Sequence, residues 1–356
     1  MPHDAIRKAA GGIIKMEKME VYKRTIDYIV SKTLIHKECI FDYQDSPYRK
    51  EFDSSFQFYF KELITQSEFY EIKPFLLYFK NDTRVNASAF TNNGFNIISI
   101  NMGTVVKLIN RFKLKTDLLT ETGNDDFCSF EKLLDMPINE LVYQTAIRFT
   151  FYHELGHIIQ KSDLLNEKMH ERVLTLVENP FENHVYEIDA DRFSSLCIGT
   201  HLIQYYLRVF KGCYTAENME KLIIITCSST LFYLLSFNTN RKEIYFEENS
   251  HPHPVIRITN IVFDIMGYCL QSMASRGFSL MLDKQTIIDK TLFFSNSIAK
   301  KKYSEDIIEN YVLIIKEKTP DIIDYMEKIN DAIENDDSLS SFKWNVLAKK
   351  IGINTI

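Results

Sequence analysis

Hydrophobic and polar residues follow two different periods along this chain, and most of the chain follows the helical one. Residues 1–70 mix charged and apolar residues at helical spacing. Two short apolar runs, Phe75–Phe79 and Phe95–Ile100, instead predict β-strands, because the turn-prone sequence at residues 91–94 lies between them. Residues 102–115 return to helical spacing. The pattern therefore predicts a small sheet in a largely helical chain.

Two long helices are expected in the middle of the chain, after an irregular acidic connection at residues 116–137. The first helix begins at Asn139, because asparagine is a favoured N-cap residue. A charged helix near residues 164–177 follows it. A loop at residues 179–180 then leads into the second long helix, which continues to about residue 209.

The apolar run Leu222–Phe237 is the one candidate for a membrane span. A span needs about 20 apolar residues. This run is shorter and contains Thr226, Ser228, Ser229 and Thr230, so we expect a buried helix. After residue 270 the chain is charged and helical to its end. A loop is expected at residues 335–337, and Trp344 is expected to be a late hydrophobic anchor.

Composition and charge exclude some classes of function. The net charge of −6 gives no electrostatic footprint for nucleic acid, so no nucleic-acid partner is expected. The six cysteines are scattered without a C-x-x-C motif, and the N-terminal residues lack the layout of a signal peptide. We therefore expect reduced thiols in a cytoplasmic protein.

The sequence HELGH at residues 153–157 carries the strongest chemical signal, and it lies inside the first long helix. On a helix, its first, second and fifth positions fall at about 0°, 100° and 40° around the axis. His153 and His157 can therefore bind one ion while Glu154 projects beside it. Both histidines continue the apolar stripe of the helix, so we expect them to be buried and to need a partner. The pattern is typical of a zinc hydrolase, with Glu154 next to a water on the metal. The apolar residues of the stripe are Val142, Ala146 and Phe149.

A third ligand is expected in the second long helix, which carries three acids within five residues. Glu187 and Asp191 share a face, whereas Asp189 is turned about 200° from Glu187. On a shared face, one carboxylate can bind the metal while the other holds a ligand imidazole through its free N–H. We predict Glu187 as the metal ligand and Asp191 as the hydrogen-bond partner. Asp189 and His184 stay open as alternative ligands.

Catalysis would also need a donor that stabilises the oxyanion of the transition state. The best candidates are His251, His253 and Arg257, because two prolines among them favour an extended backbone that presents alternate side chains to a cleft. We predict catalytic roles for His253 and Arg257 beside Glu154 as general base. A structural role, in which these side chains cap helix ends, stays open. The alternative donors are Tyr152 and Tyr186.

The two metal-binding motifs resemble those of the gluzincin metallopeptidases, in which H-E-x-x-H is followed by E-x-x-A-D, here at residues 187–191. The resemblance implies the same third zinc ligand. Residues 148–152 look like the lead-in to this motif in ImmA/IrrE-type regulatory proteases. Residues 85–90 and 95–101 are similar to the edge-strand region of HtpX-type peptidases. Residues 251–258 resemble the H-P…R segment of HtpX-type and phage-exclusion (Lit-type) peptidases.

The Lit-type resemblance is the closest, and it implies an abortive-infection protease that cleaves a host protein. Such an enzyme would have a protein or peptide substrate and a protein or phage-derived activator. The ImmA/IrrE-type resemblance implies instead the cleavage of a repressor or partner in stress or mobile-element regulation. The HtpX-type resemblance would imply membrane association. The apolar run Leu222–Phe237 argues against it, because it is too short to span a bilayer. A non-catalytic zinc-containing interaction protein is the remaining alternative, although a structural ion has no use for Glu154.

These expectations together give an α+β fold that is predominantly helical. An edge strand at Phe95–Asn101 is expected to pack against the zinc-binding helix and to capture an extended peptide. We expect a helical N-terminal extension at residues 1–70, a metallopeptidase domain at 71–270 and a helical C-terminal extension at 271–356. This last extension should pack on or cover the catalytic domain. The expected cofactor is Zn²⁺, and the expected reaction is hydrolysis of a peptide bond in a protein.

Overall fold

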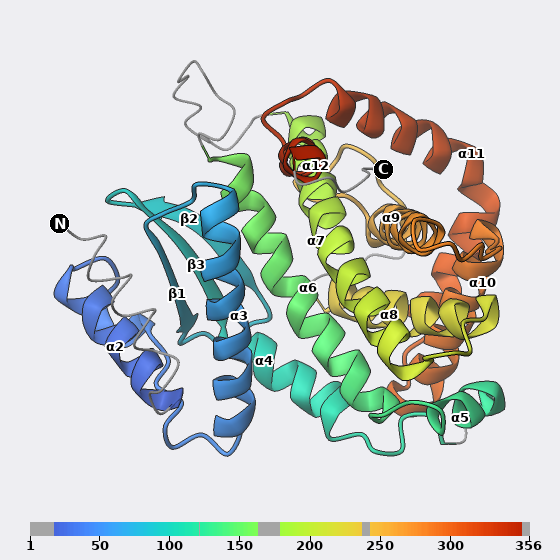
Figure 1. Ribbon diagram of the computed structural model, residues 1–356, viewed down its shortest axis with the longest axis horizontal. Helices are drawn as coiled ribbons and strands as arrows, with labels where there is room; N and C mark the ends of the chain where they lie inside the picture. Colours follow the sequence, from blue (N-terminus) through green and yellow to red (C-terminus); the bar gives the residue numbers. More distant parts are fainter. Residues whose placement is uncertain (1–17, 121, 163–178, 237–242, 351–356) are drawn as a thin grey trace. The chain divides into compact units, whose positions relative to one another are not determined.

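The computed structural model describes residues 18–120, 122–162, 179–236 and 243–350 (Figure 1). The chain divides into two compact units, Met1–Val106 and Lys107–Ile356. The fold is α+β and predominantly helical, as predicted. The predicted domain bounds at residues 1–70, 71–270 and 271–356 stay predictions. The helix expected near residues 164–177 lies outside the described residues.

The first unit combines two long helices with a mixed three-stranded sheet. Helices α2 (Lys18–Ser31) and α3 (Arg49–Phe69) both pack against strand β1 (Phe75–Lys80). The strand order is β1-β3-β2, so β3 (Phe95–Asn101) is central. It pairs in parallel with β1 and antiparallel with β2 (Ala87–Asn92). A short 3₁₀ helix, η1, lies at Lys37–Cys39.

The predicted edge strand is therefore wrong, because β3 has a hydrogen-bonded partner on both sides. A two-residue turn at Asn93–Gly94 explains the difference. Both residues have positive φ angles, 48° and 74°, as a type I′ hairpin turn requires. The turn folds β2, a strand that the sequence analysis missed, back along β3. The buried residues Ile97–Ile100 also suit a central strand better than an edge.

The second unit is built around four long helices. Helix α6 (Ile138–Gln160) contacts α7 (Pro180–Val209) and α8 (Ala216–Leu235), and α9 (Pro254–Ala274) packs on α7 and α8. Helix α4 (Met102–Leu108) crosses the boundary between the units. The remaining elements are η2 (Ile109–Lys113), α5 (Asp125–Glu131), α10 (Lys284–Ile298), η3 (Ala299–Tyr303), α11 (Ile307–Glu334) and α12 (Ser340–Lys350).

Helix α6 begins at Ile138, and its N-cap is Pro137, two residues before the predicted N-cap Asn139. The side chain of Asn139 instead donates to the carbonyl of Lys113 at 2.7 Å. Glu131, at the end of α5, accepts the Ile138 N–H at 2.7 Å. A carboxylate from another helix therefore caps α6, and α5 itself lies within the connection expected to be irregular.

Helix α8 covers most of the apolar run that was considered for the membrane, and its residues from Leu222 onward are buried. Among the residues that the structure describes, no helix has the length and apolar character that a bilayer crossing demands. Near the C-terminus, α11 and α12 flank the loop expected at residues 335–337. Trp344 is only half-buried, whereas its neighbour Lys343 is fully buried.

Helices α6 and α7 run side by side in the second unit (Figure 1), and they approach closely at Gly156. A methyl group added to Gly156 would lie 3.1 Å from Cα and 3.3 Å from Cβ of Ala190. These two small residues lie within the two metal-binding motifs, one on each helix. The close contact therefore sets the separation of the helices at the place where the predicted ligands lie.

We expect the replacement Gly156→Val to lower the free energy of unfolding by about 1–3 kcal/mol, because the larger side chain overpacks this contact. The control is Gly267→Ala on α9, where an added Cβ meets no atom within 4 Å. That change should stabilise the protein by roughly 0.5–1 kcal/mol through helix propensity. Urea unfolding measures both effects. A Gly156→Val protein as stable as the wild type would contradict the proposed contact.

Candidate metal centre

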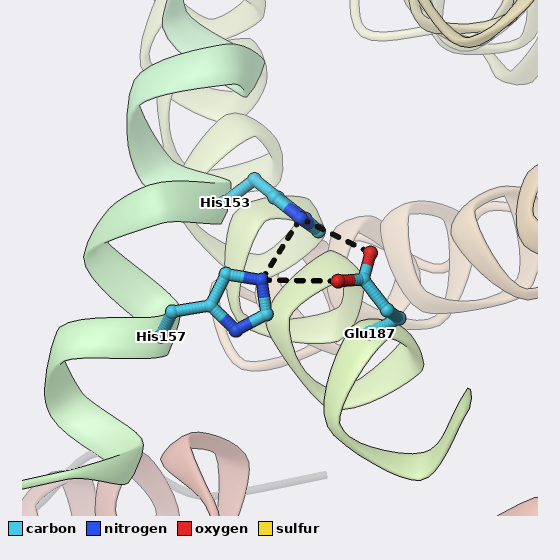
Figure 2. Close-up of side chains that lie close together, drawn as sticks. All are labelled: His153, His157 and Glu187. Carbon is cyan, nitrogen blue, oxygen red and sulfur yellow. Dashed lines mark hydrogen bonds and ion pairs between the residues drawn. The ribbon is translucent and has the colours of Figure 1, made fainter. Parts of the chain in front are cut away.

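Two histidines of α6 and one glutamate of α7 point toward a common centre (Figure 2). The Nε2 atoms of His153 and His157 are 3.1 Å apart. Oε2 of Glu187 lies 3.4 Å from Nε2 of His153, and Oε1 lies 3.4 Å from Nε2 of His157. The structure thus brings together the three side chains that the sequence analysis selected as ligands. His153 is buried, whereas His157 is only half-buried.

The hydrogen bonds of the two imidazole rings determine which ring nitrogens are unprotonated and direct a lone pair toward the centre. His153 Nδ1 lies 2.9 Å from Oδ1 of Asp191, and a carboxylate can only accept, so Nδ1 carries the proton. His157 Nδ1 lies 3.0 Å from Oε1 of Gln160. The amide nitrogen of Gln160 donates elsewhere, so its oxygen accepts from His157. In the neutral rings, both Nε2 atoms therefore direct lone pairs at each other and at Glu187.

This donor set fits a zinc ion. Bond lengths of about 2.0–2.2 Å to nitrogen and oxygen in a tetrahedron place the ligand atoms about 3.3 Å apart, close to the distances of the three side chains. Oε2 of Glu187 is fully buried, and within the described part of the chain no donor forms a hydrogen bond with it. Such an orphaned buried acceptor is costly unless a cation satisfies it.

The ionisable groups of the centre are strongly perturbed. Burial alone would lower the pKa of His153, but its hydrogen bond to Asp191 and its contact with Glu187 raise it to about 10. Burial opposes the ionisation of Glu187, yet the two histidines hold its pKa well below the usual range. Burial raises the pKa of Glu154, and the histidines offset this effect only in part. The centre therefore favours a positive charge among its ligand atoms, which a proton or a metal ion would supply.

Asp191 connects the first histidine to a buried arginine of α9. Arg257 donates from Nε and Nη2 to the two carboxylate oxygens of Asp191, both at 2.7 Å. Burial would raise the pKa of Asp191, but the arginine and His153 lower it. Asp191 thus has the predicted position beside a ligand imidazole. The hydrogen bonds of Arg257 go to Asp191, and its Nη1 lies 3.7 Å from Oε2 of Glu187. This geometry gives Arg257 a positioning role in place of the expected catalytic one.

The expected catalytic role of His253 is also corrected, because this side chain is 0% exposed. Its Nδ1 accepts the Val255 N–H and caps α9, while its ring packs between Tyr245 and Tyr311. His251, two residues earlier, is different. Its side chain is 62% exposed, and its Nε2 lies 3.6 Å from Oε1 of Glu187. Of the histidines in this segment, His251 is therefore the one at the open side of the centre.

The alternative ligands and donors have other partners. His184 donates from Nε2 to the carbonyl of Asn249 and bonds through Nδ1 to the hydroxyl of Tyr325, both at 2.7 Å. Asp189 faces α12 and accepts hydrogen bonds from its first two residues. The hydroxyl of Tyr152, a buried side chain, lies 2.7 Å from Nε2 of His201. Neither alternative ligand belongs to the group of His153, His157 and Glu187.

Gln160, whose amide oxygen accepts from His157, was not among the residues predicted from the sequence. Its side chain also donates to the carbonyl of Tyr186 at 2.9 Å and to Oδ2 of Asp189 at 2.8 Å. A signal was present, since Gln160 follows His157 by three residues and therefore shares its face of the helix. Its two partners on α7 could not be inferred from spacing, because they depend on the packing of α6 against α7.

The chain was also compared with protein-family models, curated proteins and solved structures, and none of the three comparisons gave a match. The resemblance to the gluzincin peptidases therefore rests on the motifs alone. The geometry of His153, His157 and Glu187, with Glu154 beside them, is the basis for a functional proposal.

Proposed function

We propose that this chain is a zinc-dependent endopeptidase that hydrolyses a peptide bond in a protein. The observation that carries the proposal is the convergence of the Nε2 atoms of His153 and His157, 3.1 Å apart, with the carboxylate of Glu187. Each of its two oxygens lies 3.4 Å from one of these nitrogens, close to the separation of tetrahedral zinc ligands. Three protein ligands leave a fourth position for water or substrate, which is typical of catalytic zinc sites. Glu154 adds a buried carboxylate next to the ligands.

The side chains of the centre have separable roles in this reaction. Zinc bound there would lower the pKa of a water molecule to about 7 and polarise the peptide carbonyl. Glu154 accepts the proton of the attacking water and passes it to the leaving amine, and its raised pKa suits both steps. His251 donates a hydrogen bond to the carbonyl oxygen as negative charge develops there. Asp191 and Gln160 keep the two ligand imidazoles in the required tautomer and orientation.

The surroundings of the centre support a protein substrate in a reducing compartment. The exposed side chain of His251 leaves one side of the centre open to solvent, and an extended or unfolded segment of a target could reach it there. All six cysteines are free thiols, which suits the cytoplasm. Under this proposal, the resemblance to Lit-type peptidases suggests a role in phage defence.

The central prediction concerns Glu154→Gln, which removes the general base but keeps the ligands. We expect about one zinc per chain in both the wild type and the variant, and loss of cleavage only in the variant. Zinc is measured by mass spectrometry after purification without chelators. Cleavage is measured by identifying new termini in a library of proteome-derived peptides. A chelator should abolish wild-type cleavage, and added zinc should restore it.

Each contrary outcome of this experiment has a definite meaning. A wild-type protein that retains no zinc, and takes up none when it is added, would refute the metal site. Equal cleavage by Glu154→Gln would refute the assigned base. Bound zinc without any cleavage in the library would favour the interaction protein over the peptidase.

The ligand assignment predicts that Glu187→Ala weakens zinc binding more than the roughly 100-fold that loss of an outer hydrogen-bond partner can cost. The matched control is Glu182→Ala, an exposed glutamate in the first turn of the same helix. This control should bind zinc like the wild type. Competition with a coloured chelator measures both affinities, and equal affinities in the two variants would remove Glu187 from the ligand set.

The two histidines of the segment before α9 should separate catalysis from stability. His251→Ala should retain zinc but lower kcat about 100-fold, because a transition-state donor is lost. His253→Ala should instead lower the thermal midpoint, since it removes a buried helix cap. Peptides cleaved by the wild type serve as substrates. Unchanged kcat in His251→Ala, or loss of its zinc, would disprove the donor role.

A further inference from the structure

The C-terminal helix α12 is attached to the helix that carries Glu187. Asp189 of α7 accepts the backbone N–H groups of Ser340 and Ser341 at 2.7 and 3.0 Å. Both serine hydroxyls also donate to this carboxylate, that of Ser340 at 2.6 Å. All three residues are buried. The carboxylate of Asp189 therefore binds the N-terminus of α12, where N–H groups without a partner in the helix and the helix dipole favour a negative charge.

The same helix is attached to the C-terminal end of α6. The ammonium group of Lys343 is buried and donates to the carbonyl of Ile159 at 2.9 Å and to that of Ser162 at 2.8 Å. It also lies 3.4 Å from the carbonyl of Gln160. A cation stabilises a helix C-terminus, because the last carbonyls have no partner within the helix. One short helix thus binds both α6 and α7.

Gln160 connects these attachments to the metal centre. Its amide nitrogen donates to Oδ2 of Asp189, the oxygen that also accepts from Ser340. Its amide oxygen accepts from Nδ1 of His157, whose Nε2 faces the centre. A continuous chain of hydrogen bonds therefore leads from α12 through Asp189 and Gln160 to His157.

The position of His157 makes this support necessary. His157 lies in the last turn of α6, which ends at Gln160. Terminal turns of helices open more readily than the interior, because part of their backbone hydrogen bonding is missing. His153, one turn earlier, has a separate support in Asp191 and Arg257. The two ligand histidines are therefore held by independent sets of residues.

We propose that Asp189, Gln160 and the first residues of α12 are positioning residues for the metal ligand His157, so that docking of the C-terminal helix sets the affinity of the centre for zinc. This inference rests on the proposed metal site and goes beyond it, because it assigns a function to a helix that carries no ligand. Ser340 is 151 residues from Asp189 in the sequence. The C-terminal region thus completes the site and does not merely cover it.

The test is a double-mutant cycle on zinc affinity, with zinc alone as the probe. Asp189→Ala and Gln160→Ala should each weaken zinc binding roughly tenfold, as loss of an outer hydrogen-bond partner does. If both act through His157, the double variant should be no weaker than the worse single variant. The visible spectrum of the Co²⁺-substituted protein should change in each variant, because it reports the ligand geometry. A merely structural role would lower stability without changing this spectrum.

The contribution of α12 is tested with Ser340→Ala combined with Ser341→Ala. This pair should weaken zinc binding by a smaller factor than Asp189→Ala, because the two backbone N–H donors remain. The matched control is Ser338→Ala, two residues earlier, whose hydroxyl donates to Asp336. It should leave the affinity unchanged. Urea unfolding of the zinc-free proteins shows whether each variant folds.

The outcomes distinguish this inference from the metal site itself. A wild-type protein without zinc affinity would overturn both. Zinc binding by the wild type, with equal affinity in a folded Asp189→Ala protein, would overturn only the inference. Additive losses in the cycle would do the same, because they would show that Asp189 acts independently of Gln160.

Discussion

The repulsion among the lone pairs of His153, His157 and Glu187 is the constraint that the candidate metal centre must meet. The two imidazole nitrogens lie 3.1 Å apart, and each lies 3.4 Å from one oxygen of the Glu187 carboxylate. With both rings neutral and protonated on Nδ1, these lone pairs repel one another. In water such a cluster would separate. Here the close approach of α6 and α7 at Gly156 holds it together, so that packing energy opposes electrostatic repulsion until a proton or a metal ion binds. The site is therefore preorganised for a metal by the contact between two small residues.

The charged groups around the three ligand side chains explain how carboxylates can be buried there. The carboxylates of Glu187 and Asp191 face the guanidinium of Arg257, whose hydrogen bonds go to Asp191. A buried carboxylate paired by two hydrogen bonds is stable as an anion. Asp191 therefore stays ionised and keeps the proton of His153 on Nδ1. The carboxylate of Glu187, whose pKa the two histidines hold low, supplies the negative charge among the ligand atoms.

Local sequence patterns predicted much of this arrangement. The helical period located α6 and α7, and the four-residue spacings placed His153 beside His157 and Glu187 beside Asp191. These are properties of a single helix face, and they require no knowledge of the fold. The same reasoning was wrong where pairing decides the outcome. The apolar run of β3 suits either an edge or the centre of a sheet, and only the turn at Asn93–Gly94 indicated a partner strand.

The polar groups that support the ligands could not be predicted, because each depends on a contact that is distant in sequence. Asp189 and Asp191 illustrate the limit. They are two residues apart, and their helical positions correctly predict that they point in different directions. Their roles, however, follow from what lies on each side: a histidine and an arginine for Asp191, and the N-terminus of a helix 151 residues away for Asp189. A buried carboxylate needs donors, but a sequence does not say which element supplies them. In this chain the supporting residues of a local motif are distributed over the whole second unit.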